Sequence, residues 1–99
     1  MFLVLLKYLK PLEEVDKFRP DHVEFLERFY AEGKFIVSGR QTSLTGGVIL
    51  ANVDTLEEIK EIVAQDPFSE NKIAYYSFIE FSPTKYDPRF KVFIKNLDS

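Results

Sequence analysis

The chain has 99 residues, a net charge of −3 at pH 7 and a composition that is 45% hydrophobic and 29% charged, which is typical of one globular domain. The acidic balance argues against binding to nucleic acid or to an anionic membrane, because both require a basic surface. The sequence has no cysteine and one histidine, so it lacks the usual ligands of iron–sulfur clusters and zinc sites, and we expect no metal.

The first third of the chain predicts a strand and two helices. Residues 2–9 are apolar at nearly every position and predict a strand. The apolar run at its start, residues 2–7, is short and broken by lysine, which is too little for a signal peptide or a membrane span, so we expect a cytoplasmic protein. Residues 12–19 predict a helix that stops at Pro20, because proline suits the first turn of a helix but not its interior. A second helix is then predicted from Pro20 to about Glu32, and Gly33 ends it.

The middle of the chain predicts two strands and a further helix. Short strands are expected at residues 35–38 and 46–53, with a glycine-containing loop between them. Thr55 followed by Glu58 has the form of a capping box and predicts the start of a helix. The Asp-Pro pair at residues 66–67 ends that helix, because the residue before a proline is pushed out of the helical conformation.

The last part of the chain completes the pattern. Residues 73–81 predict a fourth strand, and a further apolar run follows at residues 90–94. The order β-α-β-β-α-β is typical of the ferredoxin-like split-βαβ fold, an α+β fold with an antiparallel sheet and both helices on one face. We expect a single domain over residues 1–99, with its core at about 1–82 and an extension at 83–99 that adds a strand.

The first and fourth predicted strands are apolar on both faces, whereas a sheet covered on one side should alternate apolar and polar residues. Two helices can cover only one face of the sheet. The simplest cover for the other face is a second copy of the chain, so we predict a homodimer that packs through the open sheet face. A monomer whose tail folds back across the sheet is the alternative.

His22 is the only imidazole and shares one side of its predicted helix with Phe25 and Leu26. One interpretation is a core histidine that is hydrogen-bonded to a backbone carbonyl. The other is a proton-transfer group, because imidazole exchanges protons near neutral pH. Both interpretations stay open on these residues alone.

Asp66 stands at the predicted C-terminal end of a helix, where the helix dipole disfavours a carboxylate by about 0.3–1 kcal/mol. We therefore expect a compensating partner. Asp66 is either a turn-forming residue before a proline, or a carboxylate that orients His22 as the third group does in a catalytic triad. The split-βαβ fold places its two helices side by side, so contact between the two residues is feasible.

The residues predicted to bind a small-molecule substrate come from a helix start, a strand end and an aromatic position: Arg19, Ser38, Gly39, Arg40 and Phe68. Arg19 is either a surface arginine or a guanidinium that holds an anionic substrate group. The segment 38–40 offers a hydroxyl, backbone donors and a cation. Phe68, with Tyr8 and Tyr75, could form the wall of an apolar pocket, although aromatic residues at such positions are usually core.

Several short motifs together resemble the YciI-like (YCII-related) family: Arg19-Pro20-Asp21-His22 with Leu26, Glu32-Gly33, Ser38-Gly39, Gly46-Gly47 and Asp66-Pro67-Phe68. Their order and spacing agree with the family over residues 2–90. The resemblance implies a ferredoxin-like fold, dimers packed sheet to sheet, and a pocket in which His22 and Asp66 meet. Some relatives look like small-molecule lyases that eliminate chloride from chlorinated hydroxylated aromatics. Arg40 replaces a family proline, which adds charge and favours an anionic ligand.

Two functional hypotheses follow. The first is a cofactor-independent enzyme of the lyase or isomerase type, in which His22 transfers a proton on a small aromatic or enol-type anion, Asp66 holds the imidazole, and Arg19 or Arg40 binds the charge. The alternative is a non-catalytic homodimeric ligand-binding or interaction protein, in which the His22–Asp66 pair is a structural link. An RNA-binding domain is rejected, because the third predicted strand carries no aromatic or basic residue.

Overall fold

One antiparallel sheet has four strands in the order β2-β3-β1-β4. The computed structural model describes residues 1–94. The strands are β1 (Phe2–Tyr8), β2 (Phe35–Arg40), β3 (Gly46–Ala51) and β4 (Ala74–Glu80). Helical connections follow β1 and β3, so the ferredoxin-like α+β fold predicted from the sequence is confirmed.

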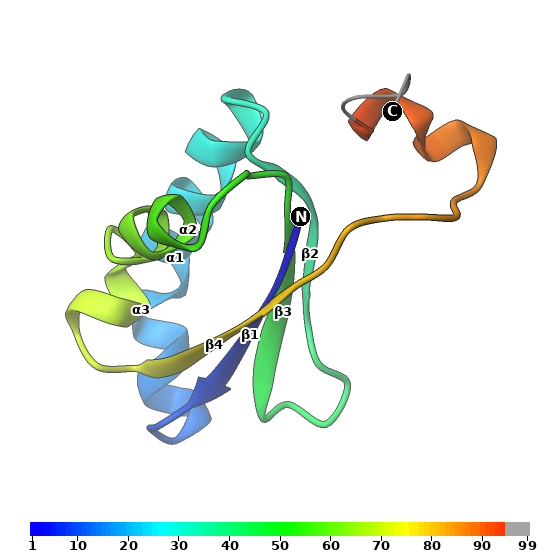
Figure 1. The fold of residues 1–99 in the computed structure, drawn as a ribbon. Helices are drawn as coiled ribbons and strands as arrows, with labels where there is room; N and C mark the ends of the chain where they lie inside the picture. The colour runs from blue at the N-terminus through cyan, green and yellow to red at the C-terminus, as the bar shows by residue number, and fades with distance from the viewer. Residues whose placement is uncertain (95–99) are drawn as a thin grey trace.

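Three helices cover one face of this sheet (Figure 1): α1 (Leu12–Ala31), α2 (Leu56–Val63) and α3 (Pro67–Glu70). The core lies between the helices and the sheet, and its largest fully buried side chains are apolar with one exception: Phe2, Phe68, Ile49, Ile59, Ile73, Val4, Val15 and Asp66. Among the described residues, Asp66 is the only charged side chain that is fully buried in this core. No helix in residues 1–94 combines the length and apolar character that a bilayer crossing requires.

α1 is one continuous helix, so the predicted break at Pro20 is wrong. A proline in a helix interior removes one backbone hydrogen bond and clashes with the carbonyl four residues earlier, at a cost of about 3 kcal/mol. The apolar face of α1 continues across the proline, because Val15 is buried before it and Phe25 and Phe29 are buried after it. Burying a side chain of this size contributes about 1.5–3 kcal/mol. Together these residues outweigh the local cost and keep both halves in one helix.

The hairpin between β2 and β3 is tighter than the predicted loop, because β2 continues to Arg40, which pairs with Gly47. Gly46 can only be glycine, since a Cβ there would lie 1.8 Å from the carbonyl oxygen of Leu6. At Gly47 a Cβ would lie 3.2 Å from the carbonyl oxygen of Gly39. These glycines let the strands meet closely at the end of the sheet where the candidate site lies.

After β4 the chain leads away from the sheet (Figure 1). The predicted extension strand at residues 90–94 is wrong, because Pro88–Phe93 forms a 3-10 helix. Asp87 caps the start of this helix by accepting a hydrogen bond from the backbone N–H of Arg89, and a proline suits the first helical position. The rest of the predicted extension, residues 95–99, lies outside the described residues.

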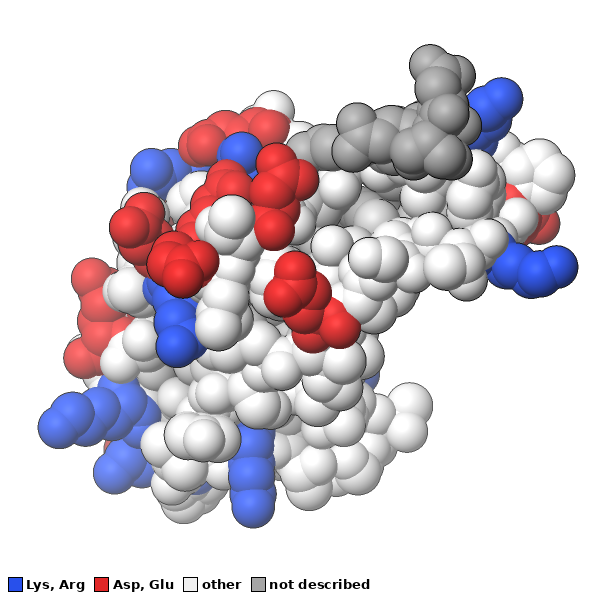
Figure 2. All heavy atoms as spheres, viewed as in Figure 1, with Lys and Arg blue, Asp and Glu red and all other residues white. Residues whose placement is uncertain are grey.

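The face of the sheet opposite the helices is largely apolar, although Lys7 and Ser77 also lie on it. Leu3 of β1 lies beside Leu50 of β3 and Ile79 of β4, and Val37 and Tyr75 extend this face on the outer strands. Val37, Tyr75 and Ile79 are 57%, 62% and 49% exposed. In Figure 2 most charged side chains lie over the helices and the tail, and an acidic group lies within the otherwise largely uncharged surface between them.

Candidate active site

A cavity of about 170 Å³ lies between α1 and the sheet. The residues predicted to bind a ligand all line it: Arg19, Ser38, Gly39, Arg40 and Phe68. His22 also lines the cavity, and Leu6, Leu26 and Ile49 contribute apolar wall. An engineered cavity of about 150 Å³ holds a benzene ring. The space therefore suits a molecule of about one small ring.

His22 and Asp66 are in direct contact, although they lie far apart in the sequence. His22 Nδ1 is 2.9 Å from Asp66 Oδ1 and 3.0 Å from Oδ2. The side chain of His22 is 13% exposed and that of Asp66 is 0% exposed. A carboxylate accepts hydrogen bonds, so Nδ1 carries the proton in this contact. The hydrogen bonds that His22 makes within residues 1–94 both use Nδ1, which leaves Nε2 for a molecule in the cavity.

Asp66 is the N-cap of α3 rather than the last residue of the preceding helix. α2 ends at Val63, and the Asp66 side chain accepts a hydrogen bond of 3.0 Å from the backbone N–H of Phe68. The interpretation that the helix dipole disfavours this carboxylate is therefore wrong, because N-cap positions favour aspartate. The expected compensating partners are nevertheless present, and they hold the carboxylate inside the core.

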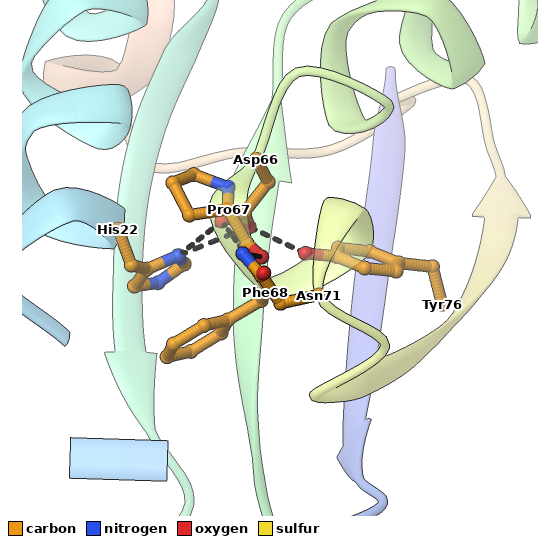
Figure 3. A network of polar contacts seen from close by, with 6 residues as sticks. All are labelled: His22, Asp66, Pro67, Phe68, Asn71 and Tyr76. Carbon is orange, nitrogen blue, oxygen red and sulfur yellow. Dashed lines mark hydrogen bonds and ion pairs between the residues drawn. The ribbon is translucent and has the colours of Figure 1, made fainter. Parts of the chain in front are cut away.

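Tyr76 of β4 is a second side-chain partner of Asp66 that the sequence analysis did not identify. Its hydroxyl donates a hydrogen bond to Asp66 Oδ2, and Figure 3 shows His22 and Tyr76 approaching the carboxylate from opposite sides. Burial, together with the nearby carboxylate, raises the pKa of Tyr76 well above its usual range. The alternation of β4 places Tyr76 on the helix-facing side, but no sequence spacing points to Asp66 as its partner.

Aromatic packing fixes the plane of the His22 ring. The rings of His22 and Phe68 are stacked, with centroids 4.0 Å apart and planes within 4° of each other. The ring of Tyr8 meets Phe68 edge-on at 6.2 Å. Tyr8 thus lines the cavity as predicted, whereas Tyr75 lies on the open face of the sheet and takes no part in this wall.

The two arginines of the cavity differ in their partners. Arg40 Nη2 is 2.8 Å from Asp16 Oδ1, and Arg40 Nε donates to the Tyr8 hydroxyl at 3.1 Å. The hydrogen bond to Asp16 is the main reason why the pKa of Arg40 is raised. Arg19 is exposed and makes no ion pair within residues 1–94, so its guanidinium can meet an anionic ligand.

Ser38 offers a hydroxyl donor in the same wall. Its Oγ accepts a hydrogen bond of 2.7 Å from the Tyr30 hydroxyl, so the serine proton can be donated to a ligand. The wall therefore combines an imidazole, cationic and hydroxyl donors, and apolar surface.

Among the described residues, no three His, Cys, Asp or Glu side chains gather in a way that could hold a metal ion.

This fold and cavity define a ferredoxin-like α+β domain with a histidine–carboxylate pair at a small-molecule-sized site. The YCII-related domain family matches residues 1–82, and the chain belongs to this family, as its motifs predicted. The uncharacterized protein YjpA of Bacillus subtilis (strain 168) is 38% identical over 64 residues, which cover 61% of this chain and 75% of that protein.

A solved structure with a similar fold is 5-chloro-2-hydroxyhydroquinone dehydrochlorinase (TftG) from Burkholderia phenoliruptrix AC1100, in complex with 2,5-dihydroxybenzoquinone. The TM-score is 0.68, and the sequences are 18% identical, with 82% of this chain and 93% of that chain covered. At this identity the similarity supports the fold.

Proposed function

We propose that the chain is a small-molecule enzyme that catalyses proton transfer or elimination without a cofactor. His22 is the acid–base group, and Asp66 holds its ring. The observation that carries this proposal is the His22 ring itself, which a buried carboxylate binds at Nδ1 and which also lines a cavity of ligand size. In this mechanism Nε2 takes a proton from the substrate, and Asp66 stabilises the imidazolium that forms.

The proposed substrate is a small anion with one aromatic ring or an enol group. Arg19 and Arg40 place positive charge in the wall, and Phe68 and Leu26 supply apolar surface. The cavity volume suits a single ring. The structurally similar dehydrochlorinase, which was solved with 2,5-dihydroxybenzoquinone, supports the choice of an oxygenated ring as the first class to examine.

The proposed step balances without a further reactant. In an elimination, Nε2 takes the proton from a substrate hydroxyl or from a carbon next to a carbonyl, the electron pair of the broken bond shifts to form the new double bond, and the leaving group departs as an anion from a tetrahedral carbon of the substrate. In an isomerisation, His22 returns the same proton to another atom of the substrate. General acid–base catalysis contributes about 10²–10⁴-fold in rate, which suits an already activated substrate.

Turnover of small hydroxylated and halogenated aromatic acids and enols tests this function. Release of halide or exchange of a substrate C–H in D₂O is measured with the wild type and His22→Gln, and with Asp21→Asn as the matched control. Asp21 is exposed on α1 beside His22 and does not line the cavity. We expect His22→Gln to lower the rate about 10²–10⁴-fold and Asp21→Asn to leave it unchanged. Equal rates in wild type and His22→Gln would refute the proposal.

The alternative function, a non-catalytic ligand-binding or interaction protein, draws on the same pair. Hydrogen bonds join α1, α3 and β4 through the buried Asp66 carboxylate, and such a link can serve stability alone. In that case His22→Ala lowers the free energy of unfolding by about 1–3 kcal/mol, because a buried acceptor loses a donor. The substitution then removes no turnover, because the wild type has none, and it affects ligand binding only through that loss of stability.

The proposed assembly is a homodimer that packs through the open sheet face. Support comes from the row of apolar side chains on that face, three of which are about half exposed or more: Val37, Tyr75 and Ile79. A symmetric pair of such faces is self-complementary, which a two-fold dimer requires. In this assembly the cavity stays open to ligand, because it lies on the helix side of the sheet.

A further inference from the structure

We propose that Tyr76 is a positioning residue for the His22–Asp66 pair. By donating a hydrogen bond to Asp66 Oδ2, its hydroxyl limits how strongly the carboxylate stabilises the protonated form of His22. The inference rests on the proposed function of His22 as the acid–base group. It assigns a role in the site to a side chain that does not line the cavity and acts only through Asp66.

Three donors reach the buried carboxylate of Asp66. Asp66 Oδ1 accepts from the backbone N–H of Phe68 at 3.0 Å and lies 2.9 Å from His22 Nδ1. Asp66 Oδ2 accepts from the Tyr76 hydroxyl and lies 3.0 Å from the same Nδ1. Because the carboxylate is shielded from water, these donors replace water in stabilising its charge.

Tyr76 can act only as a donor to Asp66. Its ring lies on β4, opposite Leu6 of β1 and on the face that the helices cover. Burial and the charge of Asp66 raise the pKa of Tyr76 so that the phenol keeps its proton across the physiological range. The hydroxyl therefore donates to Asp66 Oδ2 and offsets part of the carboxylate charge throughout the physiological pH range.

The consequence concerns the proton on His22. If the Tyr76 hydroxyl is removed, more of the carboxylate charge acts on the imidazole, and the protonated ring becomes more stable. The carboxylate also loses the contact that fixes its rotation from the side of β4. An acid–base residue must release its proton in each cycle, and a carboxylate that is hydrogen-bonded to Tyr76 opposes that release less than a bare one does.

The other titratable or charged groups around His22 come from each element that packs near it. Arg19 of α1, Tyr8 of β1 and Arg40 of β2 line the same cavity, and Arg40 is paired with Asp16. These groups are unchanged by substitution of Tyr76. A shift in the titration of His22 in such a variant therefore reports the Tyr76–Asp66 contact.

NMR titration of the His22 ring tests the inference, and the single histidine makes the assignment unambiguous. In Tyr76→Phe we expect the titration midpoint of the ring to move to higher pH by roughly 0.5–1 unit, the shift to which the net contribution of one typical hydrogen bond converts. Tyr75→Phe is the matched control on the opposite face of β4 and should leave the midpoint in place. A folded Tyr76→Phe with an unmoved midpoint would overturn the inference.

Replacement of Tyr76 by 3-fluorotyrosine provides the opposite change and retains the volume of the ring. The fluorinated phenol is more acidic and a stronger donor, so the His22 midpoint should move to lower pH; no movement would overturn the inference even if Tyr76→Phe fails to fold. Neither titration requires a substrate. Absence of turnover with every compound tested counts against the proposed enzyme, whereas an unmoved midpoint counts against the role of Tyr76.

Discussion

At the scale of single residues, the buried carboxylate of Asp66 is the feature that the rest of the core does not explain. Burying a carboxylate away from water costs free energy unless hydrogen bonds replace its hydration. Asp66 recovers this cost from the backbone N–H of Phe68, from His22 and from Tyr76, and each donor belongs to a different element. The carboxylate is therefore held from three elements at once.

This account predicts a large effect of Asp66→Ala on stability. The variant loses the N-cap of α3 and leaves buried donors unpaired, so the free energy of unfolding should fall by about 2–4 kcal/mol in urea denaturation. Asp87→Ala is the matched control, since Asp87 also caps a helix but lies at the surface of the tail. Similar, small losses in both variants would contradict the view that Asp66 organises the core.

The raised pKa of Tyr76 predicts a dependence of stability on alkaline pH. Above the usual tyrosine value of about 10, the unfolded chain loses the Tyr76 proton while the folded chain keeps it. Folding then requires uptake of that proton, so this contribution to stability is complete below pH 10 and is lost above it, by about 1.4 kcal/mol per pH unit. Between pH 9 and 11 the free energy of unfolding, measured by denaturation, should fall less steeply with pH in Tyr76→Phe than in Tyr75→Phe. Equal slopes in the two variants would contradict the raised pKa of Tyr76.

At the scale of elements, α1 carries Arg19 and His22 on either side of a proline that its interior should not tolerate. Pro20→Ala restores a backbone N–H for the helix and removes the clash, against a small gain in the entropy of the unfolded chain. We expect the free energy of unfolding to rise by about 1–2 kcal/mol. Pro67→Ala at the first position of α3 should give no such gain, because proline is suited to that position. A loss of stability in Pro20→Ala would contradict the proposal that packing alone holds the helix together.

The sequence predicts long elements well and short ones poorly, for physical reasons that these residues illustrate. The period of the apolar residues identifies α2, the four strands of the sheet and the helical character of both halves of α1, although not their continuity across Pro20. α3 has four residues, too few for a period, and its Asp-Pro start was interpreted only as the end of the helix before it. Proline does destabilise the helix interior at position 20, but the burial of Phe25 and Phe29 against the core contributes more free energy than the proline costs.

The candidate site was predictable residue by residue but not as a geometry. His22, Arg19 and the segment 38–40 were identified from their chemistry and from the resemblance to a family. The contact of His22 with Asp66, which is 44 residues away, depends on how α1 packs against α3. Tyr76 had no signal in the sequence, because tyrosines on strands are common and only the folded register places this one beside Asp66.

At the scale of the whole molecule, the open face of the sheet predicts self-association. A charge placed in a dry sheet-to-sheet interface is unpaired and desolvated, so Ile79→Glu should convert a dimer to a monomer in analytical ultracentrifugation. Leu44→Glu is the control, because Leu44 is also apolar and exposed but lies in the loop between β2 and β3. A wild type that sediments as a monomer at all concentrations would exclude this interface.

The central claim is that Asp66 holds the His22 ring by Nδ1 so that Nε2 serves as the acid–base atom in the cavity. Long-range ¹H–¹⁵N NMR of the single histidine tests this claim directly, in the wild type and in Asp66→Asn. The account predicts that the neutral ring carries its proton on Nδ1, that Nε2 titrates, and that the titration midpoint moves to lower pH in Asp66→Asn. A neutral ring protonated on Nε2, or a titration that ignores the substitution, would contradict the account and leave His22 as a core residue.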